Sequence, residues 1–243
     1  EDYAALNVSV TVKNRDFRPR SVQVVAELCD EAGAVCAKTA FPLTMLGSTE
    51  ETVSETVVLP SPKLWSAETP NLYTVEVVQK DAEGKEEHVF ATKYGFRHIE
   101  IRDGLVYING ERILFKGANL QDTHPMTGRT VDIATMLTDV KMMKQSNMNT
   151  VRTSHYPRQA KMYAMFDYYG LYCMDEADLE CHYNWDKGKD TGGITNEDSW
   201  RAQYIDRTVR MVYRDRNFPS IIFWSLGNES GGGKNFQHTY AAV

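Results

Sequence analysis

SIIFWSLGNES, residues 220–230, is the stretch of sequence that decides the fold. It starts as a short apolar run and ends in the polar residues Asn228 and Glu229, as a buried strand does when it opens into a polar loop. Upstream segments have the same form: ILFKGANL (113–120), NTVRTSH (149–155) and LYCMDEADLE (171–180). Helical patterns lie between and around them at 132–147, 158–170 and 200–217. Alternating strands and helices predict a parallel sheet.

A parallel sheet of this kind closes either as a doubly wound sheet or as an eight-stranded barrel. Strands with chemically active residues at their C-terminal ends fit half of a (β/α)8 TIM barrel, so we assign residues 101–243 to the N-terminal half of such a barrel, truncated in this chain. Such a half exposes two sheet edges and an unfilled interior. We therefore expect the isolated chain to be unstable or to self-associate.

The first part of the chain has a different pattern. Short alternating strands with turn residues between them predict an all-β, immunoglobulin-like sandwich over residues 1–100. The expected strands are LNVSVTVKN, SVQVVAELCD, ETVSETVVLP, LYTVEVVQK and HVFATKYGFR. Between Cys29 and Cys36, Gly33 can take the positive φ that a hairpin needs. The two cysteines either face each other across that hairpin as a disulfide or are two buried thiols.

Charge and hydropathy exclude some classes of partner. The net charge is -6, without a run of Lys and Arg that would track phosphates, so we expect no nucleic acid partner. No stretch approaches the roughly 18 apolar residues that span a bilayer, and we expect no membrane partner. Four cysteines in 243 residues are not a disulfide scaffold, and the cellular compartment stays open.

The predicted strand ends carry many polar residues where a barrel places its active site. The residues concerned are Asn119, Gln121, Asp122 and His124, then Arg152, Ser154 and His155, then Asp175, Glu176, Asp178, Glu180 and His182, and finally Asn228 and Glu229. Buried ionisable groups cost free energy unless they are paired, so a purely structural barrel has little need of this density.

Glu229 is the first candidate for catalysis. A carboxyl group held by an apolar strand can keep a proton near neutral pH and donate it, although a glutamate here can equally cap the following glycines or pair with an arginine. Trp185 and Trp224 could stack on a sugar ring, but Trp224, inside SIIFWSL, has the setting of a core residue.

Glu180 and His182 stand two residues apart, so in an extended segment they point to one side and can share a hard cation. The simpler interpretation is a salt-bridged pair. His155 precedes Tyr156 and Pro157, which places it in a turn where it can bond either a sugar hydroxyl or backbone groups. Arg152 would face the opposite side of a regular strand, so one of the two must leave the sheet for both to reach a common site.

Several ordered motifs together resemble the glycoside hydrolases of family 2, most of all their β-galactosidases. They are YGFRHIEIRDGLVYINGERILFKGANLQDTHP, NTVRTSHYP, DYYGLYCMDEADLE and DRNFPSIIFWSLGNES. The resemblance runs from LWSAETPNLYTV near Trp65 to Ser230. It implies a sandwich followed by a catalytic barrel, and a hydrolase of terminal β-D-galactose that works by double displacement with a carboxylate nucleophile and an acid about 5 Å away.

The resemblance also implies a role for each matched residue. Glu229 matches the general acid/base and Asn228 a contact to the sugar. His155 matches a sugar-binding histidine and Arg152 the arginine that supports the nucleophile. Glu180, His182 and Glu229 match the ligands of Mg²⁺.

Family members supply the nucleophile from a later strand, so this chain holds only one of the two carboxylates and we expect it to be inactive in isolation. Glu176 differs in position from a nucleophile and is read as structural. The intact protein is expected to be a homo-oligomer that binds a β-galactoside.

The chain departs from the family pattern at Gln121, where a substrate-facing histidine usually stands. The sugar therefore stays open between galactose and the glucuronic acid or mannose that the family also accepts. From the residues alone, a non-catalytic carbohydrate-binding module built on the sandwich is a third possibility, but it would gain nothing from the polar strand ends.

Overall fold

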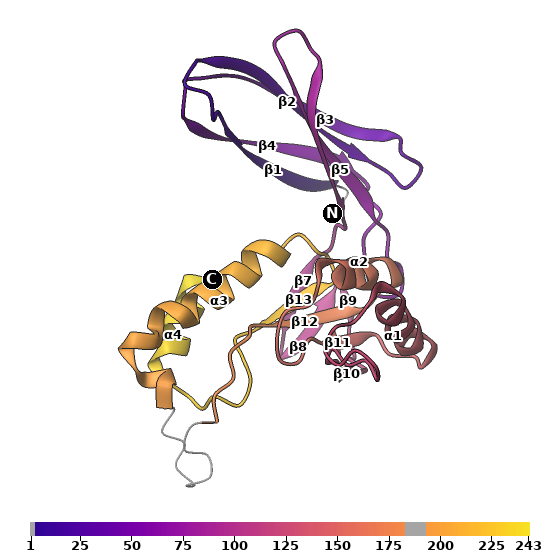
Figure 1. Cartoon of the computed structure of the whole chain (residues 1–243). Helices are drawn as coiled ribbons and strands as arrows, with labels where there is room; N and C mark the ends of the chain where they lie inside the picture. Colours follow the sequence, from indigo (N-terminus) through magenta and orange to yellow (C-terminus); the bar gives the residue numbers. More distant parts are fainter. Residues whose placement is uncertain (1–2, 183–192) are drawn as a thin grey trace. The chain divides into compact units, whose positions relative to one another are not determined.

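The computed structural model describes residues 3–182 and 193–243. The chain forms two compact units, one made of Glu1–Trp65 and Asn71–Phe96, the other of Ser66–Pro70 and Arg97–Val243 (Figure 1). None of the helices in the described residues is long and apolar enough to cross a membrane.

The first unit is a sandwich of two antiparallel sheets. Strand β1 (Tyr3–Lys13) pairs with β4 (Glu50–Pro60), and the other sheet has the order β3 (Val35–Met45), β2 (Arg20–Cys29), β5 (Tyr73–Lys80) and β6 (Glu86–Tyr94). Alternate residues of both sheets meet in one apolar layer, in which Leu6 and Val57 contact the group around Leu28 and Val75. The predicted sandwich is confirmed, and inward and outward residues alternate clearly along β1 and β3.

Strand β3 was not among the strands predicted from the sequence, in which only the hairpin turn between Cys29 and Cys36 was recognised. Its outward residues include Lys38 and Thr44 and its inward residues Phe41 and Leu43, an alternation that the proline between them obscures. Neither alternative expected for Cys29 and Cys36 holds. All four cysteines are free, and Cys36 is exposed while Cys29 is half-buried, so they are not two buried thiols.

The second unit contains a parallel sheet in the order β10 (Gly117–Asn119), β11 (Thr150–Arg152), β12 (Tyr172–Glu176) and β13 (Ile221–Ser225). The helices α1 (Ile133–Gln145), α2 (Ala160–Tyr169) and α3 (Arg201–Asp215) connect successive strands. The helix α4 (Lys234–Ala242) follows β13, and two short 3-10 turns, Gly193–Asn196 and Asp198–Trp200, precede α3. The arrangement confirms the predicted part of a barrel (Figure 1).

A small antiparallel sheet of β7 (Ile99–Arg102), β8 (Leu105–Ile108) and β9 (Glu111–Arg112) precedes β10. Its tight turns use positive φ at Asp103 and Asn109, each followed by a glycine that also has a positive φ. The second of these turns closes the segment VYING, residues 106–110.

The helices begin and end where their sequences direct. The Asp132 carboxylate accepts a hydrogen bond from the backbone N–H of Thr135 (2.8 Å) and so caps α1. Gly170 ends α2 with φ 76°, in the left-handed region, and a Cβ there would lie 2.3 Å from the carbonyl oxygen of Ala67. Among the apolar residues of α1, Met136 and Val140 are buried, whereas Ile133 is exposed.

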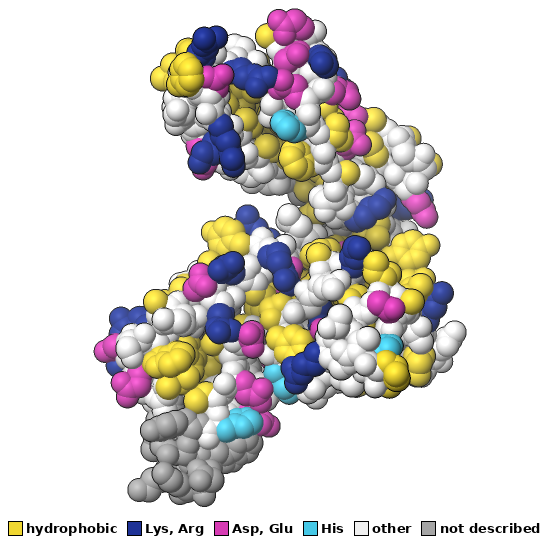
Figure 2. All heavy atoms as spheres, viewed as in Figure 1, with side chains coloured by type: hydrophobic (Ala, Val, Ile, Leu, Met, Phe, Trp, Pro, Cys, Tyr) yellow, Lys and Arg dark blue, Asp and Glu magenta, His cyan; other side chains and the backbone are white. Residues whose placement is uncertain are grey.

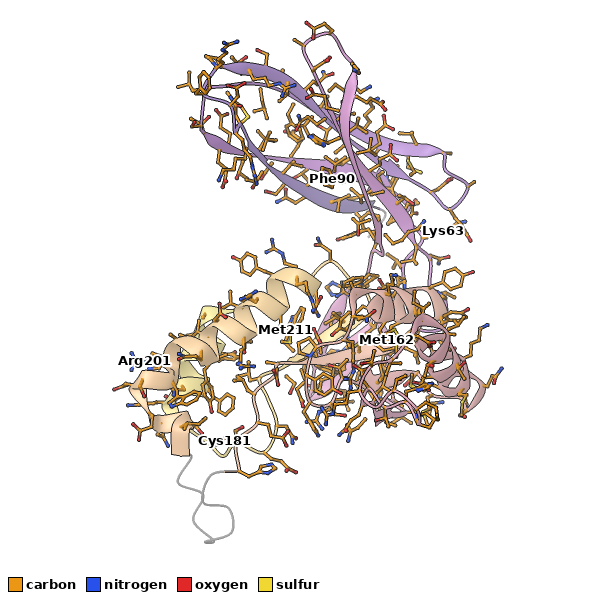
Figure 3. All side chains as sticks on the ribbon, viewed as in Figure 1. Lys63, Phe90, Met162, Cys181, Arg201 and Met211 are labelled. Atoms are coloured by element: carbon orange, nitrogen blue, oxygen red, sulfur yellow. The ribbon has the colours of Figure 1, made fainter. Side chains whose placement is uncertain are left out.

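Two apolar clusters hold the helices on the sheet. One joins α1 and α2 to β11 and β12 through Val140, Val151, Phe166 and Cys173, and the other joins α3 to the segment that follows β12. Met162 of α2 and Met211 of α3, both labelled in Figure 3, belong to these two clusters. The helices pack against the strands through these apolar residues, and the polar residues lie at the C-terminal ends of the strands.

Candidate active site

The C-terminal ends of β11, β12 and β13 bring a group of polar side chains together. Arg152 is the last residue of β11 and Glu176 the last of β12, while Asn228 and Glu229 follow β13. In Figure 2, acidic and histidine side chains gather on the lower part of the second unit. This gathering is the one expected for the chemically active edge of a barrel.

Glu176 lies at the centre of this group and is completely buried. Its Oε2 accepts a hydrogen bond from Arg152 Nε (2.6 Å), and its Oε1 accepts one from Arg152 Nη2 (2.9 Å). His155 Nδ1 lies 2.8 Å from Oε1. Arg152 and His155 thus reach the same carboxylate, because β11 ends at Arg152 and the chain has already left the sheet at His155.

Asn228 links this group to the next one. Its Oδ1 accepts a hydrogen bond from Arg152 Nη2 (2.9 Å), and its Nδ2 donates to Glu180 Oε1 (2.8 Å). The Asn228 backbone N–H donates to the carbonyl of Leu179 (2.8 Å). The turn before it depends on Gly227, where φ is 149° and a Cβ would lie 2.5 Å from that same carbonyl oxygen.

Glu229 has a φ of 40°, in the left-handed region that few side chains other than glycine adopt. A non-glycine residue there is strained, and such residues concentrate at functional sites. Its side chain is 49% exposed and its carboxylate lies beside an imidazole. The sequence predicted a carboxyl group held by an apolar strand, whereas within the described residues this side chain is half exposed.

Glu180, His182 and Glu229 form a compact set of possible metal ligands. His182 Nε2 lies 3.2 Å from Glu180 Oε1 and 3.0 Å from Glu229 Oε2, and one ligand atom from each residue lies within 4.8 Å of the others. Cys181, labelled in Figure 3, separates Glu180 from His182 in the chain. Two carboxylates and an imidazole on an exposed edge fit a divalent cation that keeps part of its water shell.

Other polar strand-end residues take no part in this group. Gln121 is exposed and, among the described residues, makes no hydrogen bond to the cluster. Asp122 pairs with Arg158 (3.2 Å), and Asp178 pairs with Arg207 (2.7 Å). His124 accepts hydrogen bonds from backbone N–H groups of its own turn. The partners of Asp122, Asp178 and His124 therefore all lie outside this group.

Two further residues, which were not predicted from the sequence, bond Glu176. Ser225 Oγ donates to Glu176 Oε2 (2.6 Å), and Thr153 Oγ1 accepts from the Glu176 backbone N–H (2.9 Å). Ser225 is the last residue of β13, so the strand-end rule could have found it. Trp224 was expected in the core but is 36% exposed. Trp185 lies outside the described residues.

Behind the site, Asp175 lies 3.1 Å from Thr153 Oγ1 and accepts a hydrogen bond from Tyr163 Oη (2.5 Å). Burial raises the pKa of Asp175 to about 7 despite these hydrogen bonds, and the neighbouring Asp215 adds to the increase. Asp175 points away from the polar group around Glu176, because neighbouring residues of a strand face opposite sides.

Comparison with known proteins gives the family. The model described as "Glycosyl hydrolases family 2, TIM barrel domain" matches residues 99–243, and that described as "Glycosyl hydrolases family 2" matches residues 1–97. A β-galactosidase of Priestia megaterium is 44% identical over 197 residues, which are 79% of this chain and 19% of the relative. A β-galactosidase of Photobacterium profundum is 38% identical over 238 residues, 96% of this chain and 23% of the relative.

Solved structures share the fold at lower identity. A β-glucuronidase from glycoside hydrolase family 2 matches with a TM-score of 0.84 and 20% identity over 100% of this chain and 24% of its own. A putative β-galactosidase from Bacteroides fragilis matches with a TM-score of 0.82 and 22% identity over 93% of this chain and 32% of its own. This chain spans about a fifth of the length of the curated relatives. On the two matched family models, which together account for nearly all of its residues, the chain belongs to glycosyl hydrolase family 2.

Proposed function

We propose that the polypeptide carrying this chain hydrolyses terminal non-reducing β-D-galactose residues with retention of configuration, and that Glu229 is its general acid/base. The observation that carries the proposal is the position of Glu229. It follows Asn228 at the C-terminal end of β13, in a left-handed backbone conformation, next to a network that ends in Arg152. The identity of 37–44% to proteins named β-galactosidase supports the choice of sugar.

The neighbouring residues have complementary roles in this proposal. Glu229 protonates the departing glycosidic oxygen and later removes a proton from the attacking water. Asn228 and His155 hydrogen-bond sugar hydroxyls, and Gln121 contacts the sugar from the end of β10. Arg152, which already bonds Glu176 and Asn228, directs its positive charge toward the carboxylate nucleophile.

The nucleophile is not among the described carboxylates close to Glu229. Glu176 is buried and both its oxygens accept hydrogen bonds, so it cannot attack an anomeric carbon. Glu180 belongs to the ligand set. Because retention requires two carboxylates about 5 Å apart, the isolated 243-residue chain is expected to be inactive.

Mg²⁺ is the cofactor we propose for the ligand set of Glu180, His182 and Glu229. The cation supplies positive charge beside the acid/base carboxylate when it is bound. The support is the donor chemistry and the close approach of the three side chains. Asn228 Nδ2 holds Glu180 Oε1, which orients that carboxylate for a ligand role.

A β-glucuronide or β-mannoside is the second candidate substrate. The observation in its favour is Gln121, an exposed amide at the position where family 2 β-galactosidases usually place a histidine. The catalytic roles above would be unchanged, since none of them depends on which sugar is bound.

The test is hydrolysis of aryl β-galactoside, β-glucuronide and β-mannoside by the full-length polypeptide, with Mg²⁺ and with a chelator. We expect magnesium-dependent cleavage of the galactoside. Preference for another sugar would keep the mechanism and change the substrate. If none of the glycosides is cleaved, the enzymatic proposal fails and a carbohydrate-binding role takes its place.

A further inference from the structure

Glu176 is a fully buried carboxylate whose hydrogen-bonding capacity is used up. Arg152 Nε and Ser225 Oγ donate to its Oε2, each at 2.6 Å. Arg152 Nη2 and His155 Nδ1 approach its Oε1 at 2.9 Å and 2.8 Å. The bidentate contact with the guanidinium fixes the plane of the arginine as well as its distance. Burying a charge costs free energy, and it is tolerated here because every lone pair has a partner.

The contact with His155 determines which ring nitrogen faces the substrate. A carboxylate accepts hydrogen bonds only, so the proton of the neutral ring lies on Nδ1. Arg152 Nη2 lies 3.3 Å from the same nitrogen, but a guanidinium is a donor and cannot compete as an acceptor. The Nε2 atom is therefore left as the acceptor for a sugar hydroxyl.

Glu176 also balances the charge of Arg152. The side chains of Arg152 and His155 are 27% and 22% exposed, whereas that of Glu176 is fully buried, so water screens this pair weakly. Without the carboxylate, a positive charge would remain uncompensated beside the proposed sugar site. The transition state of glycoside cleavage resembles an oxocarbenium ion and is itself positively charged.

We propose that Glu176 is a positioning residue of the hydrolase site. It holds the Arg152 guanidinium and the His155 ring in their working orientations and neutralises Arg152, so that the site stays favourable to positive charge in the sugar ring. The proposal rests on the proposed function, because it assigns Glu176 a task in that reaction. Ser225, which bonds the same carboxylate, belongs to the same arrangement.

The test uses the full-length polypeptide with the substitutions Glu176→Gln, Glu176→Asp and, as a stability control, Val140→Ala. Val140 is completely buried in the helix cluster and is not part of the site. For each protein we would measure kcat and KM on the preferred aryl glycoside, the Tm, and the inhibition constants of a cationic iminosugar and of the uncharged lactam of the same sugar.

We expect Glu176→Gln to lower kcat/KM by about 100-fold, the size of loss that misplacement of a positioned group by about 1 Å produces. We also expect Glu176→Gln to raise the inhibition constant of the cationic iminosugar by about tenfold relative to that of the lactam, because a nearby negative charge has been removed. Glu176→Asp keeps the charge, so it should preserve the preference for the cation and recover part of kcat/KM. Val140→Ala should lower the Tm and leave kcat/KM and the preference for the cationic inhibitor unchanged.

The proposal is overturned if Glu176→Gln keeps kcat/KM within about threefold of wild type, or if it weakens both inhibitors equally, as a merely structural change would. Should Glu176→Gln fail to fold, Glu176→Asp and Ser225→Ala decide: reduced kcat/KM in both supports positioning, and wild-type values in both refute it. A wild-type protein that cleaves no glycoside would refute the proposed function together with this role. An active wild type matched by Glu176→Gln would refute this role alone.

Discussion

Asp167 offers a test of how the buried side of the barrel half responds to pH. Its carboxyl group lies in α2, is 2% exposed and accepts a hydrogen bond from the backbone N–H of Ser220 (2.9 Å). Burial raises the pKa of Asp167 from 3.8 to about 7, and the Ser220 hydrogen bonds and the Arg97 charge oppose this increase only in part. Asp167→Asn keeps an oxygen for Ser220 and removes the ionisable group.

The sign of the effect follows from proton binding. Between pH 3.8 and about 7 the folded protein holds a proton on Asp167 that the unfolded chain has lost. The free energy of unfolding therefore falls as the pH rises through this range. A shift of this size corresponds to about 4 kcal/mol as an upper limit, at about 1.4 kcal/mol for each pKa unit. Asp175, whose pKa burial also raises to about 7, contributes in the same direction.

The assay is urea unfolding of wild type and Asp167→Asn at about pH 5 and about pH 8. We expect the free energy of unfolding of the wild type to fall from about pH 5 to about pH 8, and that of Asp167→Asn to fall less. At about pH 8 the variant should therefore be at least as stable as the wild type. Asp206→Asn, at an exposed residue paired with Arg210, is the matched control and should leave the pH dependence unchanged. If Asp167→Asn is as destabilising at about pH 8 as at about pH 5, attraction to Arg97 outweighs burial and the reasoning is refuted.

Three further substitutions test the site and the core. Glu180→Gln removes a charged ligand, so Mg²⁺ affinity in calorimetric titration should fall by at least about tenfold, and unchanged affinity would exclude Glu180 from the metal site. Gly227→Ala places a Cβ 2.5 Å from the Leu179 carbonyl oxygen, and kcat/KM of the full-length polypeptide should fall by about 100-fold; wild-type kinetics would mean that this turn shifts without cost. Val140→Ala should lower the free energy of unfolding by about 1–3 kcal/mol in urea, and no measurable loss would contradict the packing of α1 on the sheet.

The order of the elements could be predicted from the sequence because local patterns determine it. Residues adjacent in the sequence determine three such features: the Asp132 cap, the end of α2 at Gly170 and the apolar strand before Asn228. Strand β3 was missed because Pro42 interrupts its alternation, and pairing with β2 over the whole strand compensates for that.

The site was predictable at the level of which strand ends carry it, and less so at the level of contacts. Nothing local indicates that Glu176 binds both Arg152 and His155, because that contact depends on where β11 ends and on the register of β11 against β12. The exposure of the Glu229 side chain could likewise not be predicted from the sequence, because it depends on the backbone turn after the strand.

The most direct test of Glu229 as acid/base uses the substitution Glu229→Ala in the full-length polypeptide. The substrate is an aryl β-galactoside with an activated leaving group, or the corresponding aryl glycoside of the sugar that the wild type prefers. The reaction is measured with and without azide. Such a leaving group departs without acid, and azide attacks the glycosyl-enzyme without base. We predict slow turnover alone, acceleration by azide, and a β-glycosyl azide product identified by NMR. Wild-type turnover by Glu229→Ala, or an α-glycosyl azide, would contradict the account.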